Sequence, residues 1–488
     1  MTATTASPTP TTPRAAKPTT LRAAAPAILA LCLTMLVEMV DNSVLSVALP
    51  TIGRDLAVGP TGLQWIVGAY SLTFGGLLMV GGTLGDRLGR RRTLLVGIAG
   101  FGLASSLVVL ATESWQLIGV RALCGVFAAL VAPGTMSLVF RLFDDDELRR
   151  RAIGLIVSVA MVGVMVGPVL GGLAVSHLPW QALLVVNAPV AAIAFWGVAR
   201  GIPVDDPAER RAGGADVPGA VLSVAMLGLT LFTFTLGVDA GWTAPVTVVT
   251  AIAALAAGVG FVLRERTAPD PMLDLRLLGR RTVRGSAILQ TGVMVAMVGV
   301  MFAATQLFQL AWGWTPLQAG LGTLPMVAGM FASGPLTDAL VARLGHRATA
   351  LAGSTSLLVS LAVEYVALGA GYPVFAAGMV LLAVAMRMVM TTSAVALIEA
   401  LPEDHTGIGS ALNDTAQEVG NVFGVAVVGT VTAAVMGTTL PTGRWSAAVV
   451  EEFLRSQRIG FAILAGLVAV ITVVGGRTLT ASRSTDEH

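Results

Sequence analysis

Long apolar stretches separated by short polar turns form the dominant pattern of this sequence. A helix needs about 20 apolar residues to cross a bilayer, and fourteen stretches of the chain come close to that length. We predict spanning helices over residues 26–50, 63–84, 93–112, 115–140, 152–176, 180–200, 217–237, 243–263, 283–308, 317–342, 348–369, 373–400, 407–437 and 459–479. An even number of spans places both ends of the chain on one side of the membrane.

The composition agrees with this pattern. Hydrophobic residues make up 55% of the chain and charged residues only 12%, whereas a soluble domain carries roughly 25% charged residues. So little charge cannot cover a water-exposed surface, and the sequence predicts an all-α polytopic membrane protein. The net charge of +2 gives no reason to expect a nucleic-acid partner.

The distribution of lysine and arginine predicts the orientation. If the N-terminus is inside, the inner segments hold 24 basic residues and the outer loops hold 4. Because basic residues concentrate in cytoplasmic loops, we expect a cell-membrane protein with both termini in the cytoplasm. Residues 1–25 are expected to form a disordered cytoplasmic tail. A cleavable signal peptide is the alternative, but the apolar run after Arg22 is too long for one. Residues 480–488 are expected to form a second cytoplasmic tail.

Few residues are suited to enzymatic chemistry. Lys17 is the only lysine, which excludes the lysine of a nucleotide-binding P-loop. Cys32 and Cys124 lie in apolar stretches, and the four histidines are scattered. We therefore expect no catalytic residue, no metal site and no enzyme activity.

One short segment occurs twice. "GTLGDRLGRR", residues 82–91, follows the second predicted helix, and "GPLTDALVARLGHR", residues 334–347, is a degraded copy. Two copies in inner loops suggest a transporter of two similar halves, although a basic turn that merely anchors the inner face is an alternative. Eight spans, not six, separate the copies. We therefore predict a six-helix half over 26–200, a linker with two inserted helices over 201–263, and a second six-helix half with its preceding loop over 264–479.

Four segments together resemble the motifs of the major facilitator superfamily. Residues 82–91 are similar to motif A, with its residues at Gly82, Asp86, Arg87, Gly89 and Arg90. "LIGVRALCGVFAA", residues 117–129, resembles motif B, with Arg121 as its arginine, although Cys124 and Phe127 depart from the usual residues. "DNSVLSVALP", residues 41–50, resembles the first-helix motif of the fourteen-helix branch. "GVMVGPVLGG" matches motif C of antiporters at Gly163, Gly167, Pro168, Gly171 and Gly172.

The resemblance implies the major-facilitator fold and, more narrowly, the fourteen-helix drug:proton antiporters. Such a protein exports hydrophobic drugs or antibiotics, some of them cationic, by alternating access of its two halves. Its partners are these small molecules, protons and the lipid bilayer, and it needs no cofactor because the proton gradient drives it. We expect a monomer. The alternatives are a dedicated exporter of one self-made metabolite and a proton-symporting nutrient importer, which motif C disfavours.

Glu38 and Asp41 are the most informative charges, because they lie inside the first apolar stretch. They are three residues apart and therefore share one helix face. A charged side chain at the bilayer centre costs about 2.5–3.5 kcal/mol, so this face should line a polar cavity. There a carboxyl group can exchange protons or attract a cationic substrate. We expect Asp41 to be needed for proton coupling and Glu38 to select substrates by charge. A purely static role, such as neutralising Arg121, is the alternative.

Three further charges lie in spans of the second half. Arg387 and Glu418 are equally far from the turn near Pro402, so an antiparallel hairpin brings them level, and we predict an ion pair between them. Glu364 lies near the outer end of its span and is expected to snorkel. Glycines at four-residue spacing in motif C allow close helix packing, either at the interface between the halves or in ordinary packing within one.

Overall fold

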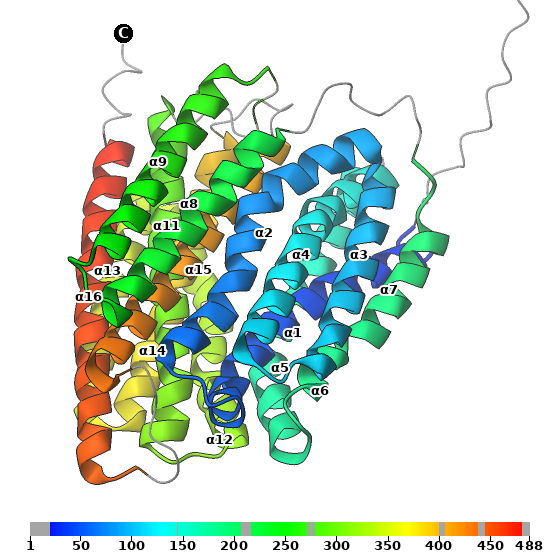
Figure 1. Ribbon diagram of the computed structural model, residues 1–488. Helices are drawn as coiled ribbons and strands as arrows, with labels where there is room; N and C mark the ends of the chain where they lie inside the picture. Colours follow the sequence, from blue (N-terminus) through cyan, green and yellow to red (C-terminus); the bar gives the residue numbers. More distant parts are fainter. Residues whose placement is uncertain are drawn as a thin grey trace, which may run out of the picture.

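The computed structural model describes residues 20–143, 145–205, 216–269, 271, 275, 279–399, 406–437 and 445–480. Helices account for nearly all of these residues, and no strand occurs among them (Figure 1). Thirteen stretches are long and apolar enough to cross a membrane. The predicted all-α membrane fold is therefore confirmed.

The first group of helices precedes residue 202. It packs as one bundle in which α1 contacts α5 and α7, and α4 contacts α2 and α3. The turn between α2 and α3 depends on Gly89, whose φ of 107° lies in the region that favours glycine. The helices are α1 (Ala25–Asp55), α2 (Pro60–Leu88), α3 (Arg90–Ser106), α4 (Ser114–Leu142), α5 (Asp146–His177), α6 (Ala182–Val185) and α7 (Asn187–Gly201).

The second group follows residue 280. Here α11 packs against α15 and α16, while α13 packs against α14 and α16. The helices are α11 (Arg281–Gln306), α12 (Pro316–Gly322), α13 (Leu324–Ala370), α14 (Tyr372–Glu399), α15 (Thr406–Met436) and α16 (Ala447–Thr480).

The longest helical stretch, α13, contains two of the predicted spans. Its backbone leaves the helical region at Gly345, where φ is 79° and ψ is 166°. Gly329 before this break packs on Val380 of α14, and Glu364 after it packs on Gly378. In a straight helix Gly329 and Glu364 would be about 52 Å apart. Contact with neighbouring points of α14 requires the chain to reverse at Gly345, so the thirteen stretches contain the fourteen predicted spans.

A pair of helices, α8 (Val217–Asp239) and α9 (Pro245–Thr267), joins the two groups along the chain. The pair packs beside them, with α8 in contact with both α2 and α15 (Figure 1). The Trp65 indole on α2 donates a 2.8 Å hydrogen bond to Thr235 of α8, and Phe234 of α8 meets Phe423 of α15 edge to face. The end of α9 lies four residues beyond the predicted end of the inserted pair.

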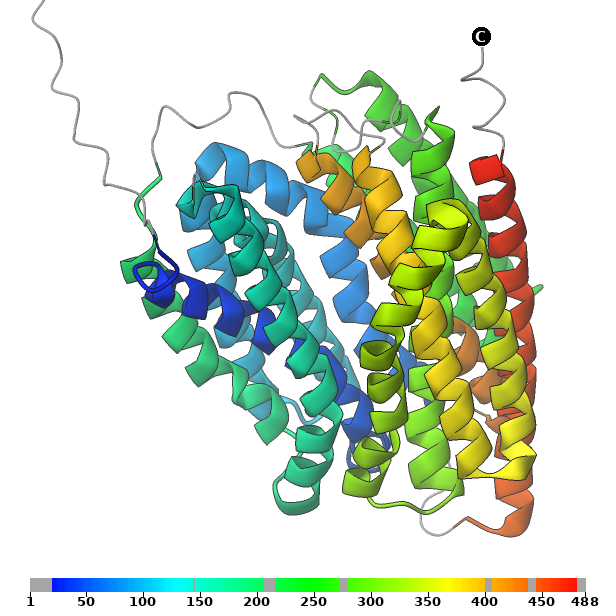
Figure 2. The same cartoon turned by 180° about the vertical axis from the view of Figure 1, so that it is seen from behind.

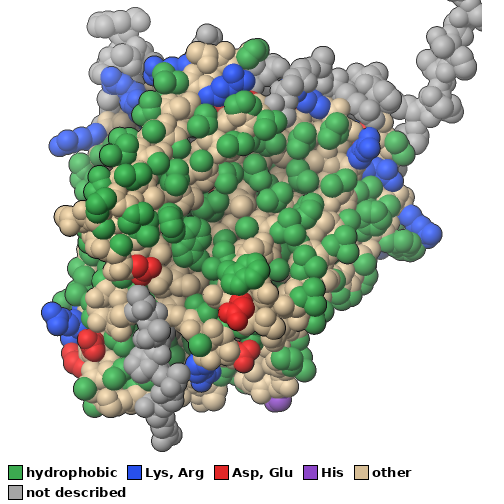
Figure 3. Space-filling view, in the orientation of Figure 1, with side chains coloured by type: hydrophobic (Ala, Val, Ile, Leu, Met, Phe, Trp, Pro, Cys, Tyr) green, Lys and Arg blue, Asp and Glu red, His purple; other side chains and the backbone are tan. Residues whose placement is uncertain are grey.

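The bundle has two distinct ends. We call the end with the α2–α3 turn and the last turn of α16 the terminal end, and the end with α12 the far end (Figures 1 and 2). Hydrophobic side chains cover the middle of the face in Figure 3, and most of its Lys and Arg side chains lie towards the terminal end.

The two groups meet most closely at the far end. There α5 packs against α12, and a Cβ on Gly172 would lie 2.7 Å from the Cα of Leu317. The ribbons of the two groups diverge towards the terminal end (Figure 2).

Candidate functional site

The candidate site is organised by α1, which carries Glu38, Asp41 and Asn42 near its middle. Glu38 and Asp41 are 5% and 1% exposed, so neither side chain faces lipid. Asn42 is exposed. Both acids are therefore kept away from lipid, as was expected for this face of α1.

Asp41 has hydrogen-bond partners on both carboxylate oxygens. Its Oδ2 forms an ion pair with the guanidinium of Arg121 on α4. Its Oδ1 accepts a 2.6 Å hydrogen bond from Nδ2 of Asn187 at the start of α7. Because all three side chains are buried, this contact joins α1, α4 and α7 inside the first group.

Arg121 is held by further contacts. Its second terminal nitrogen donates a 3.3 Å hydrogen bond to Asn42, and its guanidinium lies 4.5 Å from the centre of the Tyr70 ring on α2. A cation over an aromatic face is stabilised by the ring quadrupole. Asp41 and Arg121, whose pairing was the static alternative considered from the sequence, are therefore in direct contact.

Glu38 differs from Asp41 in its surroundings. Its Oε2 is buried and has no hydrogen-bond partner in the described part of the protein. The charges that act on it come from Glu418 and Asp414 of the second group and from Asp41. Glu38 also lines a cavity of about 20 Å³, together with Thr34, and this cavity has room for about one water molecule. Glu38 therefore lies within electrostatic range of acidic residues of the other half of the protein.

The predicted ion pair between Arg387 and Glu418 is not formed. Glu418 lies against α2, where a Cβ on Gly75 would be 2.5 Å from its own Cβ, and it accepts a 3.1 Å hydrogen bond from Asn421. The Arg387 guanidinium lies near Gly334 of α13. Equal depth was not sufficient, because α15 packs mainly on α2 and α11 and turns Glu418 away from α14.

Glu364 is also not where the sequence placed it. Instead of reaching the membrane surface it is fully buried against Gly378 of α14. Neither of its oxygens has a hydrogen-bond partner among the described residues.

The motif A turn lies at the terminal end and is secured by a residue that sequence analysis did not identify. Asp86 pairs with Arg90 at 2.9 Å, both partly exposed. Asp205, after α7, accepts hydrogen bonds from the backbone N–H groups of Arg91 and Arg92 at 3.1 and 3.0 Å, and it pairs with Arg141 of α4 at 2.7 Å. Asp205 thus stabilises the N-terminus of α3, which carries a positive partial charge. No sequence motif marked it, because the loop that carries it is distant in sequence.

The remaining motif A residues lie at the end of α2. Gly82 lies near Pro133 of α4, Arg87 is in the last turn, and Gly89 supplies the turn that leads to α3.

The motif C glycines serve both kinds of packing. Gly163 and Gly171 approach α1, where added Cβ atoms would lie 3.1 Å from Leu36 and Val44. Gly167 packs against Ser43, which also lies on α1. Gly172 and Pro168 contact α12 of the second group. Motif C therefore joins α5 to α1 within one half and joins the two halves at the far end.

Comparison with known proteins identifies relatives over most of the chain. Residues 31–425 match the family model described as the Major Facilitator Superfamily. The puromycin resistance protein pur8 of Streptomyces alboniger is 33% identical over 451 residues, which cover 90% of this chain and 88% of pur8. The multidrug resistance protein Stp of Mycobacterium tuberculosis (strain CDC 1551 / Oshkosh) is 31% identical over 85% of this chain and 76% of its own.

A solved structure shares the fold. The POT family transporter PepTSo superimposes with a TM-score of 0.69 at 14% identity, covering 96% of this chain and all of that one. The match confirms the arrangement of helices and carries no information on substrate.

Proposed function

The chain belongs to the major facilitator superfamily, and we propose that it exports hydrophobic drugs or antibiotics, some of them cationic, across the cell membrane. It is a multi-pass membrane transporter, and resistance and multidrug efflux are the functions named for its relatives. The excess of basic residues in the segments at the terminal end supports an orientation with both termini in the cytoplasm.

One observation carries the proposed substrate site: the buried Glu38 carboxyl has an oxygen without a hydrogen-bond partner among the described residues, and Glu418 of the other half packs on Gly75 of α2, within electrostatic range of Glu38. Carboxylates that interact through a medium of low dielectric repel one another. The cluster is stable only when protons or a cation neutralise part of its charge. Protons and a cationic substrate would therefore compete for the same site, which is the requirement for exchanging one for the other.

Alternating access explains why the cluster draws on both halves. Relative movement of α1 and α15 changes the separation of the acidic groups, and with it the affinity for protons and cations. Outward opening would separate α5 from α12 and break the contact between Gly172 and Leu317. The proton gradient then supplies the energy, and no cofactor is required.

Asp41 has a different role in this proposal. A proton that binds Asp41 would break its ion pair with Arg121 and leave a buried guanidinium without its counter-charge. Breaking a buried pair costs about 3–5 kcal/mol. Asp41 is therefore needed for transport of every substrate, either as a coupling residue or as the partner that holds Arg121.

The test is flux driven by an imposed pH gradient in proteoliposomes, with one lipophilic cation and one neutral drug. Glu38→Gln removes the charge and retains the shape, so the flux of the cation is expected to fall about ten-fold or more, while that of the neutral drug is retained. Glu452→Gln, an exposed carboxylate on α16, is the matched control and should change neither. Equal losses for both compounds in Glu38→Gln would contradict the proposed selectivity.

Asp41→Asn, measured in the same assay, is expected to lose flux of both compounds. Its thermal stability in detergent separates the two roles. A variant as stable as the wild type that no longer couples flux to the gradient supports coupling, and a destabilised variant supports the structural role. Full gradient-driven flux would exclude both.

A further inference from the structure

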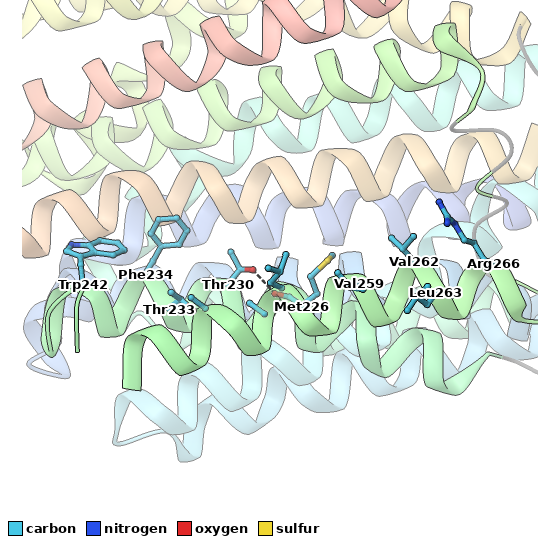
Figure 4. A pocket seen from close by; sticks show the side chains of 13 residues that line it. Met226, Thr230, Thr233, Phe234, Trp242, Val259, Val262, Leu263 and Arg266 are labelled. Atoms are coloured by element: carbon cyan, nitrogen blue, oxygen red, sulfur yellow. Dashed lines mark hydrogen bonds between the residues drawn. The ribbon is translucent and has the colours of Figure 1, made fainter. Parts of the chain in front are cut away.

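A groove runs along the inserted helix pair, away from the acidic cluster. It has a volume of about 740 Å³ and is formed by one face of α8, the turn after it and one face of α9 (Figure 4). The side chains labelled in Figure 4 extend from Trp242 at one end to Arg266 at the other.

The lining of the groove has few groups that could form hydrogen bonds with a polar ligand. Most of its side chains are aliphatic or aromatic. The two hydroxyl groups in it, on Thr230 and Thr233, each donate a 2.7 Å hydrogen bond to a carbonyl of their own helix. Because these donors are already used, the middle of the groove suits an apolar chain.

The groove faces the acyl chains of the bilayer. In the 18-residue stretch of α9 that could cross the membrane, only 17% is buried, the smallest share among the described candidate spans. Val259 and Leu263, which line the groove, are 51% and 54% exposed. A lipid chain can therefore enter sideways without any rearrangement of the helices.

A single charged side chain, Arg266, lines the groove. It lies in the last turn of α9, and it has no ion pair with any described residue. The charged residues next to it in the chain do not line the groove: Arg264 binds Asp216 at 2.8 Å, and Glu265 is buried. Among the described residues, Arg266 is thus an unpaired cation at one end of an apolar channel, which complements an apolar chain with an anionic head.

We propose that this groove binds an anionic phospholipid of the inner leaflet, with its phosphate on Arg266 and one acyl chain between α8 and α9. The geometry supports this occupant. Residues 258–266 of α9 span about 12 Å, close to one leaflet of a hydrocarbon core about 30 Å thick. Basic pockets between membrane helices on the cytoplasmic side favour anionic lipid headgroups.

Native mass spectrometry of the full chain, released from nanodiscs of equal parts phosphatidylglycerol and phosphatidylcholine, tests the proposal. The wild type should retain phosphatidylglycerol preferentially. Arg266→Gln should reduce that preference about five-fold, the effect of one basic residue near an anionic surface. Arg284→Gln removes an exposed arginine from α11, outside the groove, and should leave the preference unchanged.

A second pair of variants tests the apolar part. Val259→Phe fills the groove and should reduce retention of both lipids, while Val249→Phe changes an exposed valine on α9 outside the lining and should not. An unchanged lipid preference in Arg266→Gln would overturn the proposal. So would a dimer mass that Val259→Phe abolishes, because the groove would then be an interface between two copies. Both readouts are independent of transport, so they stand or fall separately from the efflux proposal.

Discussion

The contact between the halves at the far end permits a quantitative prediction. We consider Gly172→Ala in α5. The added Cβ would lie 2.7 Å from the Cα of Leu317 and would also meet the backbone carbonyl of Pro316. Carbon atoms pack without strain at about 3.5–4.0 Å. The atoms on both sides belong to helix backbones, so α5 and α12 must separate by most of an ångström.

The energetic cost follows from this geometry. Overpacking by one methyl group typically costs about 1–3 kcal/mol. The cost applies only while α5 and α12 are in contact, so it destabilises this conformation relative to one in which the far end is open. The equilibrium between the two should shift about 5- to 150-fold towards the open far end.

Spin labels can measure this shift. We propose cysteines at His177 of α5 and Leu321 of α12, both exposed and one on each half, after replacement of Cys32 and Cys124. The distance distribution should gain a longer component in Gly172→Ala. Gly154→Ala, in the same helix, is the control, because its Cβ would have no neighbour within 4 Å. An unchanged distribution in Gly172→Ala, or an equal shift in Gly154→Ala, would refute the reasoning.

Three further predictions concern stability in detergent, measured by thermal unfolding. Glu364→Met keeps the γ-carbon that packs on Gly378 and removes a buried carboxyl group that has no hydrogen-bond partner among the described residues, so the melting temperature should rise. Arg121→Ala should destabilise by about 3–5 kcal/mol, because Asp41 is then buried without its counter-charge. Asp205→Ala should lose about 1–3 kcal/mol through the orphaned N–H groups of α3, more than Asp86→Ala, whose exposed ion pair contributes about 0–1 kcal/mol. Unchanged melting on loss of Glu364, Arg121 or Asp205 would contradict the corresponding assignment.

The fold could be predicted from the sequence because each spanning helix depends on the length of its own apolar run and on the basic residues next to it. Each span is defined by its own apolar run, and even the two spans within α13 were separable, since the break at Gly345 lies within a basic turn. The pairing of Asp41 with Arg121 was also within reach, because depth along a helix can be counted from its ends.

The sequence does not show how each helix is rotated about its own axis, and therefore which neighbouring helix a given side chain meets. Arg387 and Glu418 are equally far along the chain from the turn near Pro402, but the packing of α15 on α2 directs Glu418 towards the other half. Glu364 was misplaced for the same reason, because its depth suggested the surface while its face points into the protein. Asp205 was missed because a loop residue acquires its role only when folding brings it to a distant helix end. Asn187 was the one overlooked residue with a signal, an amide within an apolar run.

The inserted pair has a consequence for how this protein relates to twelve-helix chains. The ion pair between Asp216 and Arg264 closes the open end of the α8–α9 hairpin, so the chain enters and leaves the insert at nearly one point. A single extra span would have inverted the second half in the bilayer. Two extra spans keep the orientation of the second half in the membrane. Because the hairpin is closed at its base, the insert leaves the distance between the halves unchanged. The topology therefore allows this element to be gained or lost as a unit without rebuilding either half.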